Sequence, residues 1–142
     1  MKYGAFALNV ETKYGIPAEV CLAQAAHETG WGKRVGGNSF FGIKSSRTWR
    51  GAIVSAGTHE YRDGEKRAEP SAFRGYSTPH DSFMDYGDFL HRNKRYAGAL
   101  TKQADPEGCI REIAKAGYAT DPKYAELVLG VMKFFERTGA KE

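Results

Sequence analysis

Apolar side chains near the N-terminus recur every three to four residues, which is the spacing of one face of an α-helix. Gly15 provides a stop for the first such segment. Pro17 can occupy the first position of a second helix, where its missing N–H costs no hydrogen bond, and Gly30 ends that helix. The periodic positions are Tyr3, Phe6, Ala7, Val10 and Tyr14, followed by Val20, Cys21, Gln24 and Ala25.

The helical pattern is interrupted in the middle of the chain. Residues 30–46 are rich in Gly, Asn and Ser, which predicts a long loop. Residues 49–55 and 59–61 have an extended pattern, Asp63-Gly64 is a hairpin turn signal, and residues 72–76 predict a returning strand. We expect a small β-hairpin or a three-stranded flap, with Pro70 keeping part of it irregular.

Helix signals then return and continue to the C-terminus. Thr78, Asp105 and Asp121 each precede a proline, a combination that predicts an N-cap followed by the first helical residue. The expected fold class is therefore α+β, mainly α, in one domain of 142 residues with a β excursion after the second helix. The expected core positions are Phe83, Tyr86, Leu90, Ile110, Ile113, Ala114, Ala125, Val128, Leu129, Met132 and Phe135.

Composition narrows the range of partners. The net charge is only +4, and the basic residues are scattered, so a nucleic-acid partner has little support, although an anionic polymer such as a cell wall suits this charge. The N-terminal residues show no signal-peptide pattern and nothing predicts membrane insertion, so we expect synthesis in the cytoplasm and release by another route. Cys21 and Cys109 are expected to be buried free thiols.

Glu28 is the most informative position, because it lies where the second predicted helix stops. The negative end of the helix dipole disfavours an ionised carboxylate there. The neighbouring Trp31 ring could exclude water, which would raise the carboxyl pKa further. A carboxyl group that keeps its proton near neutral pH can protonate a glycosidic oxygen. A solvated glutamate at a helix end is the alternative interpretation of this segment alone.

Other catalytic classes find no support. His27-Glu28 and His59-Glu60 both begin like the zinc motif HExxH, but Trp31 and Asp63 stand where the second histidine is required. We therefore expect no metal and no cofactor. Cys21 lies in the middle of a predicted helix, away from the helix N-terminus that activates a nucleophilic thiol.

Three ordered motifs carry a resemblance to a known family. They are Gln24-Ala25-Ala26-His27-Glu28-Thr29-Gly30-Trp31-Gly32, Asn38-Ser39-Phe40-Phe41-Gly42-Ile43-Lys44 and Gly117-Tyr118-Ala119-Thr120-Asp121-Pro122-Lys123-Tyr124-Ala125. From about Gly15 to the C-terminus, the chain resembles glycoside hydrolase family 73, the peptidoglycan endo-β-N-acetylglucosaminidases. This resemblance implies a lysozyme-like α-lobe at about 1–46 and 77–142, with a β-lobe at about 47–76 that closes a groove.

The resemblance also assigns roles to residues. It implies that Glu28 is the general acid, that Glu60 is the second acidic residue and that Tyr118 is the motif tyrosine. Asn38, Phe41 and Gly42 match the segment that lines the groove in the family. Trp31 and Tyr124 could add aromatic faces for sugars. His27, Ser39 and Phe40 depart from the common family residues.

We therefore expect a metal-free hydrolase that acts as a monomer on peptidoglycan and cleaves after N-acetylglucosamine. Glu60 could act as a base, could stabilise oxocarbenium charge, or could support attack by the substrate's own acetamide. The rival enzyme is a lytic transglycosylase or a muramidase, and the rival of another class is a non-catalytic glycan-binding module. A phage lysin and a domain from an autolysin or a flagellar protein both fit the sequence.

Overall fold

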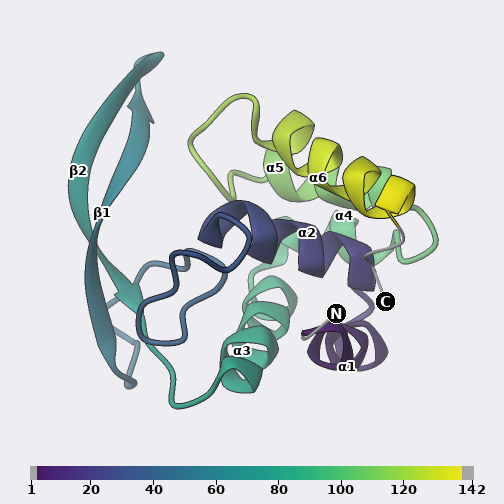
Figure 1. Ribbon diagram of the computed structural model, residues 1–142, viewed down its shortest axis with the longest axis horizontal. Helices are drawn as coiled ribbons and strands as arrows, with labels where there is room; N and C mark the ends of the chain where they lie inside the picture. The colour runs from purple at the N-terminus through teal and green to yellow at the C-terminus, as the bar shows by residue number, and fades with distance from the viewer. Residues whose placement is uncertain (1–2, 139–142) are drawn as a thin grey trace.

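The computed structural model describes residues 3–138, and within this range the helices form one lobe with one long β-hairpin along its side (Figure 1). The elements are α1 (Gly4–Tyr14), α2 (Ala18–Thr29), β1 (Ile53–Arg62), β2 (Glu65–Arg74), α3 (Pro79–Arg92), the short 3-10 helix η1 (Lys94–Tyr96), α4 (Ala97–Leu100), α5 (Pro106–Lys115) and α6 (Tyr124–Thr138). The predicted α+β class, mainly α with a β excursion after the second helix, is confirmed.

Local sequence signals set most helix boundaries. Gly15 and Gly30 end α1 and α2 in the left-handed conformation, with φ of 77° and 58°, which glycine adopts without steric cost. Thr78 and Asp105 cap α3 and α5 by accepting hydrogen bonds from backbone N–H groups three residues later. These predictions are confirmed.

Two boundary predictions are wrong by one or two residues. Pro17 is the N-cap of α2 and is not its first helical residue. Pro122 lies in a turn before α6, which begins at Tyr124. Asp121 accepts a hydrogen bond from the Lys123 backbone N–H in that turn, so its side chain closes the turn and does not cap a helix beginning at Pro122.

Helix α2 lies at the centre of the helical lobe, where it packs against α1, α5 and α6 (Figure 1). Nearly all of its apolar face is buried, and the core extends to the predicted stripes of α3, α5 and α6. Ala114 and Ala125 are only half-buried at the edge of this core. The central position of α2 fixes its C-terminal end, and therefore Glu28, against the rest of the lobe.

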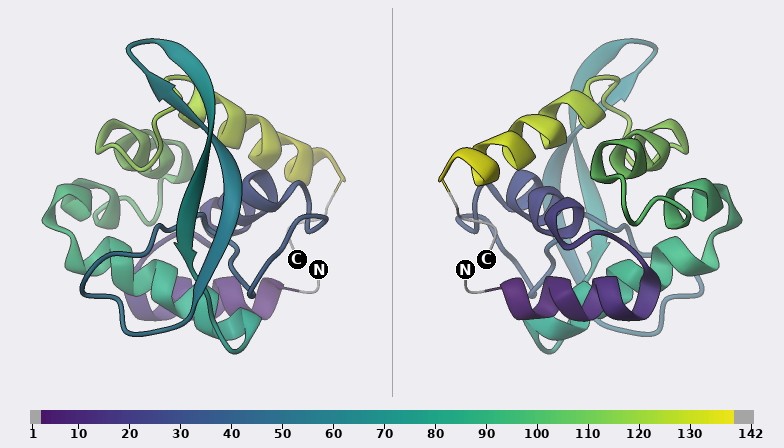
Figure 2. Two further views of the ribbon diagram at one scale, coloured as in Figure 1. Left: turned by 90° about the vertical axis from the view of Figure 1, so that its left-hand side faces the viewer. Right: turned by 90° about the vertical axis from the view of Figure 1, so that its right-hand side faces the viewer.

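The hairpin is one two-stranded antiparallel sheet that crosses one side of the helical lobe (Figure 2). Our three-stranded alternative is wrong within the described residues. Strand β1 begins at Ile53, later than predicted, because Trp49 precedes it in a turn and donates a hydrogen bond to the Ala52 carbonyl. Pro70 does not make the hairpin irregular: it pairs with Gly57 inside the ladder. Among residues 3–138 neither strand pairs with a third strand, so both are edge strands, which tolerate proline.

Two further expectations concern burial and membranes. Cys21 and Cys109 are buried free thiols, as predicted. Across residues 3–138, each helix is too short or too polar to cross a lipid bilayer.

Candidate active site

Glu28 lies in the last turn of α2, half-buried and facing the loop that precedes the hairpin. Gly42 of this loop has φ of 64°, and a Cβ at this position would lie only 2.7 Å from Glu28 Oε2. A side chain on residue 42 would therefore collide with the carboxyl group. Burial, together with the smaller effect of the nearby Glu60 charge, raises the pKa of Glu28 from 4.5 to about 7.

Glu60 is the second carboxylate, and the hairpin carries it toward the helical lobe. Its side chain lies on β1 and is buried. Both of its oxygens have partners: Oε2 lies 3.1 Å from Lys44 Nζ, and Oε1 accepts a 3.0 Å hydrogen bond from the Thr120 hydroxyl. The Thr120 hydroxyl also accepts a 3.0 Å hydrogen bond from the Tyr61 backbone N–H. Thr120 therefore joins the hairpin to the loop between α5 and α6.

Tyr118 and Tyr124 form an aromatic wall close to Glu28. Their rings are stacked with centroids 5.7 Å apart, and the charge of Glu28 helps to raise both phenol pKa values after burial, which is the larger cause. Tyr118 donates a 2.6 Å hydrogen bond to the Phe41 carbonyl. Tyr124 accepts a hydrogen bond from the buried amide of Gln24, so its position is fixed from within the core.

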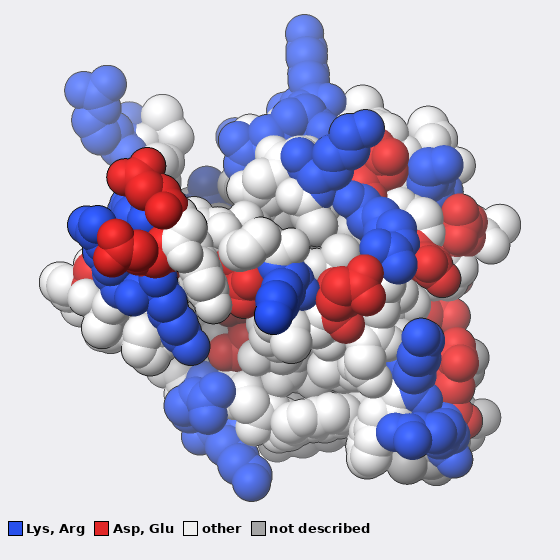
Figure 3. All heavy atoms as spheres, turned by 90° about the horizontal axis from the view of Figure 1, so that it is seen from above, with Lys and Arg blue, Asp and Glu red and all other residues white. Residues whose placement is uncertain are grey.

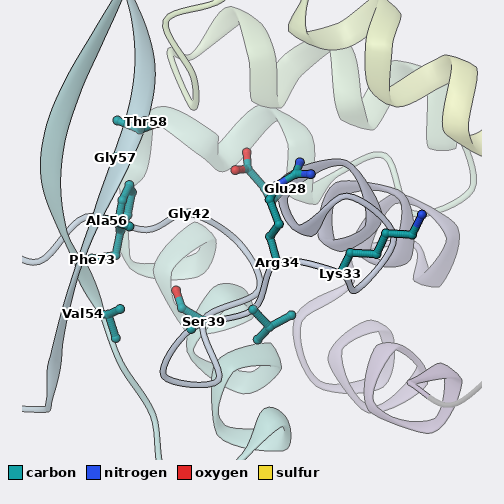
Figure 4. Close-up of a pocket in the computed structure, with 12 residues that line it drawn as sticks. Glu28, Lys33, Arg34, Ser39, Gly42, Val54, Ala56, Gly57, Thr58 and Phe73 are labelled. Atoms are coloured by element: carbon teal, nitrogen blue, oxygen red, sulfur yellow. The ribbon is translucent and has the colours of Figure 1, made fainter.

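Two cavities meet at Glu28. One, of about 470 Å³, extends between the 33–42 loop and β1, past Ser39, Val54 and Phe73 (Figure 4). The other, of about 560 Å³, extends between the hairpin and the Tyr118–Tyr124 segment and includes Glu60. Glu28, Arg34 and Thr58 line both cavities and mark the border between them. An extended chain could therefore pass Glu28 with units on either side.

The structure brings together Glu28, Gly42, Glu60, Tyr118 and Tyr124, all of which the sequence singled out. It corrects the expected position of three other residues. The Trp31 ring packs edge-on against Phe134 and Phe135 and is 49% exposed, so it lines neither cavity beside Glu28.

Phe41 and Asn38 are the other two corrections. The Phe41 ring is buried and stacks on Tyr86, so no sugar can reach it, and only its backbone carbonyl contributes to the site, through Tyr118. The Asn38 side chain donates to the Tyr76 carbonyl, which holds the loop in place, and lines neither cavity. A glycine-rich loop leaves such orientations undetermined by sequence alone.

Sequence reasoning also missed residues that border the cavities. Lys44 and Thr120 stand inside the quoted motifs, but nothing in their spacing indicated that both contact Glu60. Arg34 follows the Gly30 turn and had no motif signal. In the part of the chain that the structure describes, no three metal-binding side chains gather in one place.

Charge is mixed over the surface that Figure 3 shows, with basic and acidic side chains interspersed on the hairpin and on the helices. The face shown in Figure 3 is therefore neither uniformly basic nor uniformly acidic. Within the groove, the pairing of Lys44 with Glu60 neutralises one cation, while Arg34 has no acidic partner among residues 3–138.

Comparison with known families identifies the family of this chain. A family model described as mannosyl-glycoprotein endo-β-N-acetylglucosaminidase matches residues 4–137, which is almost the whole chain. The chain belongs to glycoside hydrolase family 73. The resemblance inferred from the three motifs is therefore confirmed, and with it the assignment to the glycosidases.

Similar proteins in this family include both longer proteins and solved domains. Peptidoglycan hydrolase FlgJ of Vibrio parahaemolyticus is 46% identical over 128 residues, covering 86% of this chain but 42% of the relative. FlgJ of Pseudomonas aeruginosa is 45% identical over 128 residues, or 85% of this chain and 32% of the relative. The chain thus spans less than half the length of these relatives.

A solved structure confirms the fold. The glycoside hydrolase domain of Salmonella typhimurium FlgJ, in a C-terminally truncated form, superposes with a TM-score of 0.75 at 34% identity. The match covers 94% of this chain and 93% of that domain. The lysozyme-like arrangement expected for family 73 is therefore the arrangement of this chain.

Proposed function

We propose that this chain hydrolyses the β-1,4 bond after N-acetylglucosamine in the glycan strands of peptidoglycan, with Glu28 as the general acid. The observation that carries this proposal is a carboxyl group with a pKa of about 7 at the border of two cavities. Such a group still holds a proton near neutral pH and can donate it to the leaving oxygen. The FlgJ relatives, named as peptidoglycan hydrolases, support the choice of polymer.

Glu60 supports the reaction electrostatically in this proposal. Both of its oxygens already have partners, so neither is free to bind and orient a water molecule, but its negative charge faces the same cavity as Glu28. An oxocarbenium-like transition state is positive at the anomeric carbon, and a fixed negative charge beside it lowers the barrier. Tyr118 and Tyr124 supply the wall against which the sugar lies.

The site of action that fits this substrate is the cell wall. Relatives with this domain include FlgJ proteins and an autolysin of Enterococcus faecalis that is 30% identical over 131 residues. We propose that the domain acts there as a monomer without a metal or a cofactor. A phage lysin and a domain of a longer autolysin or flagellar protein remain equally consistent with this substrate.

Replacing Glu28 by glutamine tests the proposal. Glu28→Gln keeps the shape of the side chain but removes the proton donor, so we expect the rate of wall lysis to fall by about a hundred-fold or more. Turbidity loss of purified wall measures the rate, and circular dichroism checks the fold. A well-folded Glu28→Gln protein that lyses wall at the wild-type rate would refute the assignment.

The sugar at the new reducing ends identifies the bond. Borohydride reduction after digestion by the wild-type protein should convert N-acetylglucosamine ends to N-acetylglucosaminitol, which mass spectrometry detects. Muramitol would indicate a muramidase, and 1,6-anhydromuramyl products would indicate a lytic transglycosylase. Wall that the wild-type protein binds but leaves uncut would indicate a non-catalytic glycan-binding module.

A further inference from the structure

Arg34 is a cation at the border of the two cavities with no role in the reaction described above. Its side chain is exposed, and among residues 3–138 no carboxylate forms an ion pair with it. Lys33 lines only the first cavity, and Lys44 and Lys66 line only the second, where Lys44 is already paired with Glu60. Arg34 is therefore available to a negatively charged ligand at the point where the two cavities meet.

The end of helix α2 holds Arg34 in this position. Its backbone N–H donates a 2.8 Å hydrogen bond to the Thr29 carbonyl. Its guanidinium lies over Gly30, where a Cβ would come within 2.6 Å of Nη1. The C-terminal end of a helix carries partial negative charge, which favours a cation there. In Figure 4 the Arg34 side chain runs beside that of Glu28, whereas Lys33 points away from the hairpin.

The substrate class of the proposed function supplies an anion at this position. Peptidoglycan alternates N-acetylglucosamine with N-acetylmuramic acid, whose lactyl group carries a peptide with free carboxylates. When N-acetylglucosamine occupies the site next to Glu28, both flanking sugars are N-acetylmuramic acid. A carboxylate-bearing substituent therefore falls near the border of the cavities whichever way the strand runs. A guanidinium binds a carboxylate through two parallel hydrogen bonds.

We propose that Arg34 binds a carboxylate of the peptide-bearing sugar next to the bond that is cleaved. This inference rests on the proposed function and deepens it, because it makes the protein selective for glycan strands that carry charged peptide stems. Uncharged polymers of N-acetylglucosamine would fit the same cavities but would leave Arg34 without a partner. Arg34 is thus a specificity-determining residue, while Glu28 performs the chemistry.

The test measures kcat/KM of wild-type, Arg34→Gln and Arg34→Lys proteins on three substrates. The first is intact purified wall. The second is the same wall with its carboxylates converted to neutral amides by carbodiimide and methylamine. The third is glycan freed of peptide by an amidase, which retains only lactyl carboxylates. Arg92→Gln is the matched control, since Arg92 is an exposed arginine on α3 that pairs only with Asp88.

On intact wall we expect Arg34→Gln to lower kcat/KM roughly ten-fold, as for loss of one charge-assisted hydrogen-bonded pair. Arg34→Lys should retain part of the activity, because it keeps the charge, and Arg92→Gln should match the wild type. On amidated wall, wild type and Arg34→Gln should be equally slow. On peptide-free glycan, the ratio of kcat/KM between wild type and Arg34→Gln identifies the group bound. A ratio as large as on intact wall would identify the lactyl carboxylate, and a smaller ratio would identify the peptide stem.

Three outcomes overturn the inference. If Arg34→Gln lowered kcat/KM by the same factor on intact and on amidated wall, Arg34 would only stabilise the end of α2. The variant would then also unfold at a lower temperature than wild type. An Arg34→Gln protein as active as wild type on intact wall would show no role for Arg34. A wild-type protein that cuts none of the three substrates would overturn the proposed function itself and this inference with it.

Discussion

Glu28 loses water on folding and gains no compensating partner. Among residues 3–138 its carboxyl group makes neither a hydrogen bond nor an ion pair, and both burial and the charge of Glu60 oppose its ionisation. The group therefore keeps its proton to about pH 7. The same surroundings that prepare this carboxyl to donate a proton make its ionised form a cost to the folded state.

We predict that Glu28→Gln stabilises the protein at alkaline pH. A carboxyl whose pKa rises from 4.5 to about 7 on folding holds its proton more tightly when folded. Stability is then lost as the pH rises from about 4.5 to 7, and each pKa unit corresponds to about 1.4 kcal/mol. Glutamine carries no charge, so the free energy of unfolding of Glu28→Gln should exceed that of wild type by about 3 kcal/mol at pH 8.

Urea denaturation of both proteins at pH 4 and pH 8 checks this difference, which should nearly vanish at pH 4. Glu126→Gln is a suitable control, because Glu126 is an exposed carboxylate that pairs with Arg111 on the surface. A Glu28→Gln protein less stable than wild type at pH 8 would contradict the cost assigned to the ionised Glu28.

The sequence predicted the position of Glu28, the proposed general acid, better than the orientation of the aromatic rings around it. Glu28 could be singled out because a helix end is a local signal. Trp31 is three residues away, but it follows Gly30 with φ of 63°, and this backbone turn sends its ring toward Phe134 and Phe135. Phe41 lies next to Gly42 at the site, yet its ring enters the core. Such orientations depend on tertiary packing, which periodicity does not encode.

At the scale of elements, the hairpin was predictable as a hairpin but not in its length. Asp63 and Gly64 adopt positive φ, as the turn signal implied. Strand β1 extends through Gly57, a residue that normally weakens a strand, because the ladder continues on both sides of its pairing with Pro70. Caps and glycine stops gave most helix ends correctly, since these depend on local backbone chemistry.

Contact between the hairpin and the helical lobe can be tested at Thr120. Thr120→Val keeps the shape of the side chain but removes the hydroxyl that bonds Glu60 and the Tyr61 N–H. We expect kcat/KM on wall to fall about ten-fold, because Glu60 and the hairpin lose a shared anchor worth about 1–2 kcal/mol. Hydrogen exchange at the Tyr61 amide should become faster.

Thr101→Val provides the matched control, because this exposed threonine at the end of α4 bonds only the Gly98 carbonyl. It should leave both kcat/KM and exchange in the hairpin unchanged. If Thr120→Val also left exchange at Tyr61 unchanged, the hairpin would be held by other contacts.

At the scale of the whole molecule, the two carboxylates belong to parts of unequal stability. Glu28 is on α2, a helix that packs against α1, α5 and α6. Glu60 is on a hairpin whose residues are mostly exposed. The hairpin meets the rest of the chain at its base, through the bridge between Lys44 and Phe73, and near its tip, through Thr120. Folding of the helical lobe therefore does not by itself complete the site.

We therefore predict that the hairpin, and not the helical lobe, limits the temperature at which the protein is active. Segments with few buried apolar contacts open at free energies well below that of global unfolding. On heating, we expect reversible loss of wall lysis several degrees below the midpoint at which far-UV circular dichroism reports melting of the helices, with activity recovered on cooling from that interval. If both losses coincided, the hairpin and the helices would unfold as one unit. A protein built in this way would reach its thermal limit as a catalyst while its helices were still intact.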